Sequence, residues 1–596
     1  MRFATVSGET GLAPFQKEHR FLPQRRLIDA DIAGRASTRG GALHLCQRND
    51  AAVVRAVYES KTVDDVEALD KVTFFDQFFA FLGNVKVLPL LEQLDAGNRV
   101  RASIPWMALI GTYVMRMVLG IPSMPQMEGL ILTDPALMTL FGLAAFVERG
   151  VTRRGLSRAR QLPAVRGAFS GEVMADTLVK TPLMALARIF NTVIRLLAEA
   201  GFFPKRVHAV VDCTDREATP KYRTLDGGPV ASVTRHKRPQ HSHNRHAPKV
   251  ATTVWGWKIW LMFCPTSGMP VAVYVDRINV DDRVWMLALV LQGKANLREG
   301  QLASVTFDRG FWDGQELYMV AQQAPFFIPG RSDLAITQEA RRMALAAYTR
   351  YQQGLPVGDA VIAKRPVRIV TGRGKNRREQ EKELIVVGIA DLDCDTYAQQ
   401  APGSRVNSKS FVAGKLNAAV VMEDPEYAKP AEEDRYLTIL TCAAMKTPAD
   451  ALFAFDRFDG RSVIENSGNK EAKQAWKLGA ALEKSEAAVY LHTFMVFMLM
   501  ALMAAFRARQ VADEQAAAEG KETGMERYRR ELQRANRDKV LVRDRNHYAV
   551  LWAWEFATLA GIRLRDHATS DVAEILKRYG VEVHDQSTSL SGDPSP

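Results

Sequence analysis

The segment VTFDRGFWDG, residues 305–314, brings a carboxylate to the end of an apolar run. Moving an unpaired carboxylate out of water is costly, so Asp308 needs a partner in the folded chain. One interpretation is that its side-chain oxygen caps the helix that follows. The other is that Asp308 is one of several carboxylates that meet around a metal ion, because hard oxygen ligands suit Mg²⁺ and Mn²⁺.

A second acid, Asp212, comes at the end of the β-branched run RVHAVVDCT, residues 206–214. If these two strands lie side by side in a sheet, Asp212 and Asp308 converge at one edge of it. Neither carboxylate could stay ionised and unpaired there, and a divalent cation would resolve the conflict. The alternative is that Asp212 is an ordinary turn residue.

The best candidate for a third acid is Glu465, in the segment FDRFDGRSVIENSGNKEAKQAW. Arg461 precedes it by four residues and shares its helical face, and Lys473 follows about two turns later. One helix would then carry a metal-ligand carboxylate flanked by cations, which suits a phosphodiester substrate. The alternative is a surface ion pair between Glu465 and Arg461. Asp459 and Glu471 are the substitutes for the third position.

The elements that must position these acids alternate between helical and strand patterns. Apolar residues repeat at helical spacing between 73 and 200, whereas 251–263, 270–275 and 302–308 are β-branched or aromatic without interruption. We therefore expect an α/β multidomain protein whose mixed-sheet core is interrupted by a β-rich insertion. The expected regions are an N-terminal arm, 1–72; a helical domain, 73–204; the first part of the core, 205–330; the β-rich insertion, 331–434; the second part of the core with the Glu465 helix, 435–510; and a charged helical C-terminal region with a disordered tail, 511–596.

Length and charge indicate several domains and a polyanionic partner. The 596 residues are too many for one hydrophobic core. Lys plus Arg exceed Asp plus Glu by 12 (79 against 67), which makes nucleic acid the first candidate partner. The five scattered cysteines form no CxxC pair and suit a reducing cytoplasm.

The apolar segment 487–506 has about the length of a membrane span. We expect a buried helix instead, because the segment contains His492 and Thr493 and directly follows the Glu465 helix. If the segment spans a membrane instead, the chain is a membrane-anchored protein, which is the third hypothesis for its function.

Two basic segments, RHKRPQHSHNRHAPK at 235–249 and TGRGKNRR at 371–378, are candidates for contacts to a DNA backbone. The candidate residues in them are Arg235, Lys237, Arg238, Arg245, Arg373 and Lys375. His241, His243 and His246 could instead bind zinc, although no paired cysteine or HExxH pattern accompanies them. A solvated loop is the remaining interpretation of the first segment.

Taken together, these residues resemble the Asp-Asp-Glu (DDE) transposases of bacterial insertion sequences, the cut-and-paste group with a β insertion in an RNase H-like core. The first Asp of that family stands in a D-x-[ST] context, here Asp212-Cys213-Thr214. Its second stands in D-R-G-[FY], here Asp308-Arg309-Gly310-Phe311. The resemblance covers residues 70–510 approximately.

The third acid of the family lies in a Tyr-x2-Arg-x3-Glu-x6-Lys helix, here Phe458-x2-Arg461-x3-Glu465-x7-Lys473. This chain departs from the pattern in three ways. Phe458 replaces the Tyr, Lys473 comes one residue late, and Ser467-Gly468 stands where the family has bulkier residues.

The resemblance implies a Mg²⁺-dependent enzyme that cleaves DNA strands at transposon ends and transfers them into target DNA. Asp212, Asp308 and Glu465 would hold two Mg²⁺ or Mn²⁺ ions, supported by Arg461 and Lys473. Double-stranded DNA would be the partner of a homodimer, with no membrane, in a bacterial cytoplasm at the nucleoid. The competing function is a domesticated DNA-binding protein, derived from a transposase, that has lost its chemistry.

Overall fold

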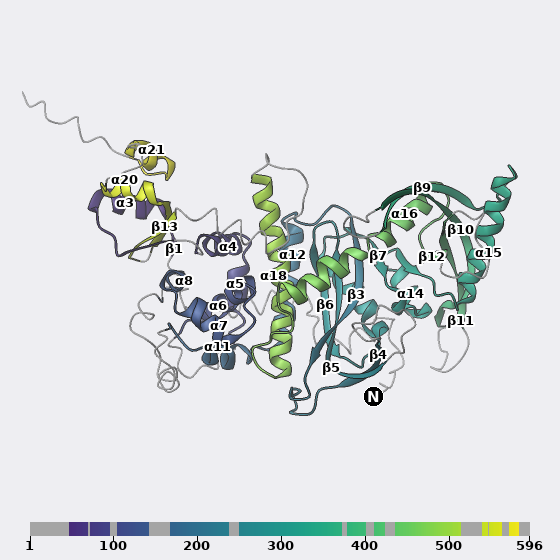
Figure 1. Cartoon of the computed structure of the whole chain (residues 1–596), viewed down its shortest axis with the longest axis horizontal. Coiled ribbons are helices and arrows are strands. Elements are labelled where there is room, and N and C mark those ends of the chain that lie inside the picture. Colours follow the sequence, from purple (N-terminus) through teal and green to yellow (C-terminus); the bar gives the residue numbers. More distant parts are fainter. Residues whose placement is uncertain are drawn as a thin grey trace, which may run out of the picture. The chain divides into compact units, whose positions relative to one another are not determined.

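The computed structural model describes most of the chain, in two compact units. The described residues are 47–68, 72–95, 104–141, 143, 167–237, 250–371, 378–400, 411–423, 436–513, 539–545, 547–562 and 571–582. Those of the large unit lie within 183–513, and those of the small unit lie within 47–182 and 539–582. Figure 1 shows the elements of both units.

One mixed sheet organises the large unit. Its strands run in the spatial order β4-β5-β3-β7-β8-β12-β11-β10-β9, and β6 also pairs with β5. Their bounds are β3 Val207–Ala218, β4 Ser232–Lys237, β5 Val250–Cys264, β6 Met269–Arg277, β7 Leu302–Phe307, β8 Phe326–Pro329, β9 Val361–Thr371, β10 Arg378–Gln400, β11 Phe411–Glu423 and β12 Tyr436–Thr441.

The first predicted strand is longer than the sequence pattern indicates. β3 continues past 206–214 to Ala218, because its last residues still pair antiparallel with β5. Its parallel pairing with β7 ends earlier, at Val211 opposite Phe307. Asp212 therefore lies within a strand and is not a turn residue, yet it sits where its parallel neighbour stops.

Helices cover the core strands and account for their apolar runs. The helices of the large unit are α12 Leu183–Glu199, α13 Met286–Asn296, α14 Gly314–Ala321, α15 Ala335–Gln352, α16 Pro448–Asp459, α17 Glu471–Gln474 and α18 Glu486–Asp513, with the short turns η2 Asp282–Trp285, η3 Arg309–Phe311 and η7 Ile464–Lys470. α12, α13 and α18 contact β6. Figure 1 shows α12 and α18 beside this strand. Trp257 and Trp260 on β5 are fully buried, as expected for core residues.

The predicted insertion continues the core sheet. β12 pairs antiparallel with β8 on one side and with β11 on the other, so β9 to β12 extend the same sheet. The region also contains the helix α15, which the sequence interpretation did not identify. α16 packs on β8 to β12 over buried apolar residues such as Val386, Ala419 and Ile439.

The structure of the small unit differs from two expectations, those for the C-terminal region and for the N-terminal arm. The C-terminal region is not purely helical, because β13 Lys539–Asp544 and β14 His547–Trp552 form a hairpin. The N-terminal arm supplies the outer strands β1 Gln47–Arg48 and β2 Asp65–Ala68 of the same sheet. Local sequence patterns do not show this pairing, since its partners are more than 470 residues apart. The predicted disordered tail lies outside the described residues.

In the small unit, some helices pack on this sheet and others pack on one another. They are α3 Asp50–Ser60, α4 Val72–Asn84, α5 Val87–Glu92, α6 Trp106–Val118, α7 Met124–Met127, η1 Glu128–Leu132, α8 Pro135–Thr139, α11 Gly171–Leu178, α20 Ala553–Ala560 and α21 Val572–Arg578. The expected helical domain 73–204 is divided, because α12 packs on α18 and belongs to the large unit.

Helix α18 is long and apolar enough to cross a membrane by composition, with a mean hydropathy of 2.0 over an 18-residue window within Glu486–Arg509. Within the described structure, however, 94% of that window is buried inside the protein. The prediction that this segment is a buried helix is therefore confirmed.

We expect Leu499→Ala to lower the free energy of unfolding by about 2–5 kcal/mol, because Leu499 is fully buried in α18 and the substitution leaves a cavity. Met184→Ala, at a position 40% exposed on α12, should change it little. Thermal unfolding of detergent-free protein measures both. Recovery of the chain only from detergent-solubilised membranes would contradict the buried-helix assignment.

Candidate active site

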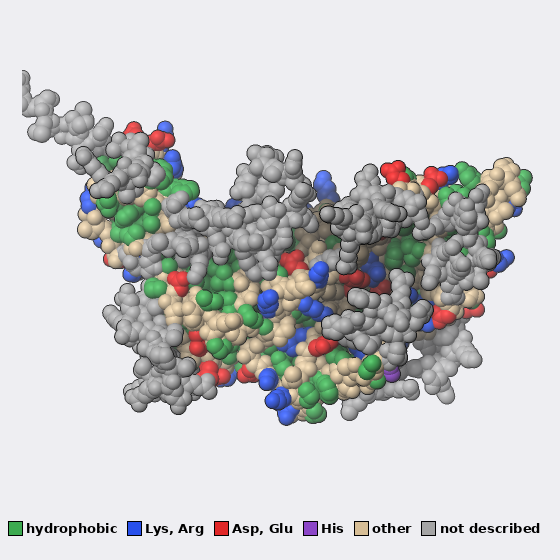
Figure 2. All heavy atoms as spheres, in the orientation of Figure 1, with side chains coloured by type: hydrophobic (Ala, Val, Ile, Leu, Met, Phe, Trp, Pro, Cys, Tyr) green, Lys and Arg blue, Asp and Glu red, His purple; other side chains and the backbone are tan. Residues whose placement is uncertain are grey.

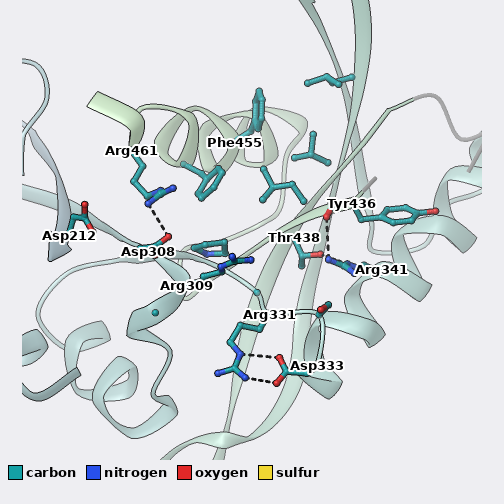
Figure 3. Close-up of a pocket in the computed structure, with 18 of the residues that line it drawn as sticks. Asp212, Asp308, Arg309, Arg331, Asp333, Arg341, Tyr436, Thr438, Phe455 and Arg461 are labelled. Atoms are coloured by element: carbon teal, nitrogen blue, oxygen red, sulfur yellow. Dashed lines mark hydrogen bonds and ion pairs between the residues drawn. The ribbon is translucent and has the colours of Figure 1, made fainter. Parts of the chain in front are cut away.

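The strand register places two of the predicted acids next to each other. Val211 on β3 is opposite Phe307 on the parallel strand β7, and each is followed by an aspartate. Asp212 and Asp308 therefore occupy neighbouring positions at the edge where β7 ends. Both line one cavity of about 1050 Å³, and Glu465 lines it as well. Figure 3 shows Asp212 and Asp308 at one end of this cavity.

Asp308 occupies the N-cap position of η3, but its side chain makes no capping hydrogen bond. Its Oδ1 instead lies 2.9 Å from Nη1 of Arg461, in a half-buried ion pair (Figure 3). The helix-cap interpretation of Asp308 is therefore wrong, and the carboxylate faces the cavity and a cation.

Glu465 belongs to the π-helical turn η7, which follows α16 after a short break. Its Oε1 lies 3.7 Å from Nη1 of Arg461, the same atom that contacts Asp308. The predicted pair at i, i+4 is thus present, although Glu465 is 59% exposed. The guanidinium of Arg461 also lies over the ring of Phe458, 5.5 Å from its centroid. One arginine therefore balances two of the three acids.

Asp212 is the most buried of the three acids and is held at both oxygens. Its Oδ1 accepts a hydrogen bond from the backbone N–H of Cys213 at 2.8 Å. Its Oδ2 accepts one from Nδ2 of Asn469 at 2.9 Å. The pKa of Asp212 is raised to about 6, chiefly by burial and less by the charges of Asp308 and Glu465. The hydrogen bond from the N–H of Cys213 and the charge of Arg461 act in the opposite direction. The carboxylate is thus destabilised in its charged form.

Sequence reasoning missed Asn469. The available signal was its position four residues after Glu465, which puts both side chains near one helical face. Gly468 beside it has a steric role, since a Cβ there would lie 3.3 Å from Cδ2 of Leu261 on β5 and 3.1 Å from Cγ1 of Ile464. The small residue lets η7 approach the sheet closely, which gives a physical reason for one of the departures from the family pattern.

Other candidates lie apart from the cavity. Lys473 is exposed on α17 and is not among the described residues that line the cavity. Asp459 and Glu471, the substitutes for the third acid, are also not among the described residues that line the cavity. Oε1 of Glu471 accepts a hydrogen bond from Nε1 of Trp476. Of the three possible third acids, Glu465 is the one that lines the cavity.

The proposed DNA contacts are mostly outside the described residues. Arg235 on β4 is described, and it pairs with Asp215 on β3 at 2.7 Å. A phosphate would have to compete with that carboxylate, so Arg235 is a weaker candidate than the sequence indicates. Outside the described side chains lie Lys237, Arg238, Arg245, Arg373 and Lys375, and the histidines His241, His243 and His246. On the face of the molecule in Figure 2, the coloured acidic and basic side chains are interspersed.

The far end of the cavity is lined by arginines and aromatic side chains (Figure 3). Arg331 pairs with Asp333 at 2.5 Å, and Arg341 donates to Oγ1 of Thr438 at 3.0 Å. Arg309, directly after Asp308, lines the cavity, and its guanidinium makes no hydrogen bond or ion pair with any described residue. The cavity thus combines acids at one end with cations that could meet a phosphate backbone.

The donor set suits a hard divalent cation, but only if Arg461 moves. The acids supply oxygen ligands, and their mutual repulsion favours a cation between them. In the described part of the chain, no three His, Cys, Asp or Glu side chains are close enough to hold an ion as they stand. Nη1 of Arg461 takes the place of such a cation, in contact with Asp308 and Glu465.

No family model matches the sequence, and no curated protein matches it either. Among solved structures, the chain is similar to one described as the cryo-EM structure of a piggyBac transposase synaptic complex with hairpin DNA. The match covers 91% of this chain and 87% of that chain, with 9% sequence identity and a TM-score of 0.31. A likeness this distant carries no argument, so the function has to be argued from the site.

We expect Asp212→Asn to stabilise the protein at neutral pH. The folded pKa of about 6 exceeds the ordinary value of 3.8, so wild-type stability is lost as pH rises through this window. Asn mimics the neutral acid, and above pH 6 the variant should gain up to about 3 kcal/mol. Below pH 4 the two proteins should be alike.

Thermal unfolding across this pH range is the measurement. Asp359 is exposed, so Asp359→Asn is the matched control. This variant should show no such pH-dependent gain in the free energy of unfolding. A variant that is less stable than the wild type at pH 7.5 would contradict the assignment of Asp212 as a destabilised carboxylate.

Proposed function

We propose that this protein is a DNA transposase of the DDE type, which cleaves strands at transposon ends and joins them to target DNA. The observation that carries the proposal is the meeting of three acids in one cavity. Asp212 and Asp308 are neighbours through the parallel register of β3 and β7, and η7 brings Glu465 to the same cavity. The sequence resemblance expects three acids at one site, and their shared cavity supports this proposal.

The strand order supports an RNase H-like core. Three antiparallel strands, β6, β5 and β3, are followed in space by β7 and β8, which run parallel to β3. An RNase H-like sheet has this mixed arrangement, with acids at the ends of its first and fourth strands. We include that fold in the proposal because the acids stand at the corresponding positions, on β3 and beside the end of β7.

In this proposal Asp212, Asp308 and Glu465 would hold two divalent cations. The chemistry that such ions would supply is activation of water or a DNA 3′-hydroxyl and stabilisation of the leaving oxygen. Away from Asp308 and Glu465, the guanidinium of Arg461 could pair with phosphate oxygens in a bidentate manner. Arg309 offers a second cation on the same cavity wall. The chain's own residues would thus orient the phosphodiester.

A DNA-binding protein that has lost its chemistry is the second candidate. The exposure of Glu465 and its contact with Arg461 favour it, since a persistent ion pair would keep this acid from a metal ion. DNA strand cleavage separates the two candidates, because both bind DNA and one cleaves it. Inverted repeats in the DNA that flanks the gene would favour a mobile element.

Asp308→Asn should lower Mg²⁺-dependent strand cleavage at least about 100-fold, because it removes a charged oxygen ligand from the site while keeping its shape. Binding to the same DNA should persist, since Lys and Arg contacts to phosphates supply most of it. The assay measures nicking and binding of DNA that carries the flanking sequences of the gene.

Asp333→Asn is the matched control, because Asp333 lines the same cavity but pairs with Arg331 at its far end. It should nick DNA at nearly the wild-type rate. Equal nicking by wild type and Asp308→Asn would show that Asp308 has no catalytic role. DNA binding without any nicking by the wild type would support the inactive, domesticated protein.

A further inference from the structure

Asn469, which contacts Asp212, is a buried polar residue with one unpartnered atom. Asn469 is 8% exposed, and its Nδ2 donates to Oδ2 of Asp212 at 2.9 Å. The other end of the amide, Oδ1, is buried and has no hydrogen-bond partner among the described residues. A buried acceptor left without a partner costs about 1–3 kcal/mol. An apolar side chain of the same size would avoid this cost.

The position of Asn469 therefore calls for a role other than stability. Its hydrogen bond fixes Oδ2 of Asp212, while the N–H of Cys213 fixes Oδ1. With both oxygens held, the carboxylate cannot rotate, and its remaining lone pairs keep one direction. A ligand held in this way loses less freedom when it binds a cation.

We infer that Asn469 is a positioning residue that holds the carboxylate of Asp212 in the orientation needed to bind a divalent cation. The inference rests on the proposed function, since it assumes that Asp212 is a metal ligand. It assigns to Asn469 a role that neither the sequence pattern nor the family motif includes.

The chemistry of an amide suits this role better than that of a charged group. An Nδ2–H donor orients a carboxylate and leaves its full negative charge available to a cation. A lysine or arginine there would neutralise Asp212, and another carboxylate would add to the repulsion from Asp308 and Glu465. The close approach allowed by Gly468 brings the amide to hydrogen-bond distance.

The test uses Asn469→Leu, which keeps the side-chain size but removes both polar ends of the amide. Titration of the full chain with Mn²⁺, followed by calorimetry or electron paramagnetic resonance, should show binding about 10- to 100-fold weaker than in the wild type. The melting temperature of the metal-free variant should stay close to that of the wild type, because the substitution removes the unpartnered Oδ1 as well as the donor to Asp212. A residue with a purely structural role would give the opposite pattern, a lower melting temperature with unchanged Mn²⁺ affinity.

A second variant tests position without changing the amide. Gly468→Ala adds a Cβ against Leu261 and should displace Asn469 from Asp212, so Mn²⁺ affinity should fall in the same direction. Gly479→Ala is the control, because a Cβ at Gly479 meets nothing within 4 Å and its φ is not in the left-handed region. This variant should bind Mn²⁺ as the wild type does.

The outcomes separate the inference from the proposed function. Asp212→Asn supplies the reference for binding elsewhere on the chain. If the wild type binds Mn²⁺ no better than Asp212→Asn, the proposed metal site itself fails. If the wild type exceeds that reference and Asn469→Leu binds as tightly as the wild type, the metal site stands and the role of Asn469 is overturned.

Discussion

The repulsion among three carboxylates at one sheet edge is the constraint on which this site depends. Asp212 is destabilised as a carboxylate chiefly by burial, and the charges of Asp308 and Glu465 add to that effect. Arg461 offsets that repulsion through one guanidinium nitrogen that contacts Asp308 and Glu465. The arrangement is stable enough to fold, yet it leaves a region where a doubly charged cation would be favoured over a singly charged side chain.

The surrounding structure serves to keep these acids together. The parallel register of β3 and β7 fixes the spacing of Asp212 and Asp308, and it is fixed in turn by the buried β-branched residues of both strands. The turn η7 is held against β5 because Gly468 has no side chain. A π-helical turn at this point is consistent with the frequent occurrence of such turns at functional sites. Close packing and an irregular helical turn therefore coincide with the position of the proposed chemistry.

Much of the site could be predicted from the sequence, because it depends on local rules. An aspartate after an apolar strand indicates a sheet edge, and a spacing of four residues indicates a shared helical face. These rules grouped Asp212, Asp308, Glu465 and Arg461, and the four residues line one cavity. The role of Asn469 could not be predicted, since it depends on how closely a π-helical turn approaches a strand. The hairpin of β13 and β14 was missed for a related reason. Its sheet partners come from residues 47–68, and no local pattern records pairing at that distance.

In the proposed function, the acids around Asp212 would form a site for divalent cations once Arg461 withdraws. The most direct test is X-ray diffraction at the manganese absorption edge from crystals soaked in MnCl₂. We predict an anomalous peak in contact with the carboxylates of Asp212 and Asp308, with the guanidinium of Arg461 moved away from Asp308. The absence of any such peak, with Arg461 still 2.9 Å from Asp308 at saturating Mn²⁺, would contradict the account.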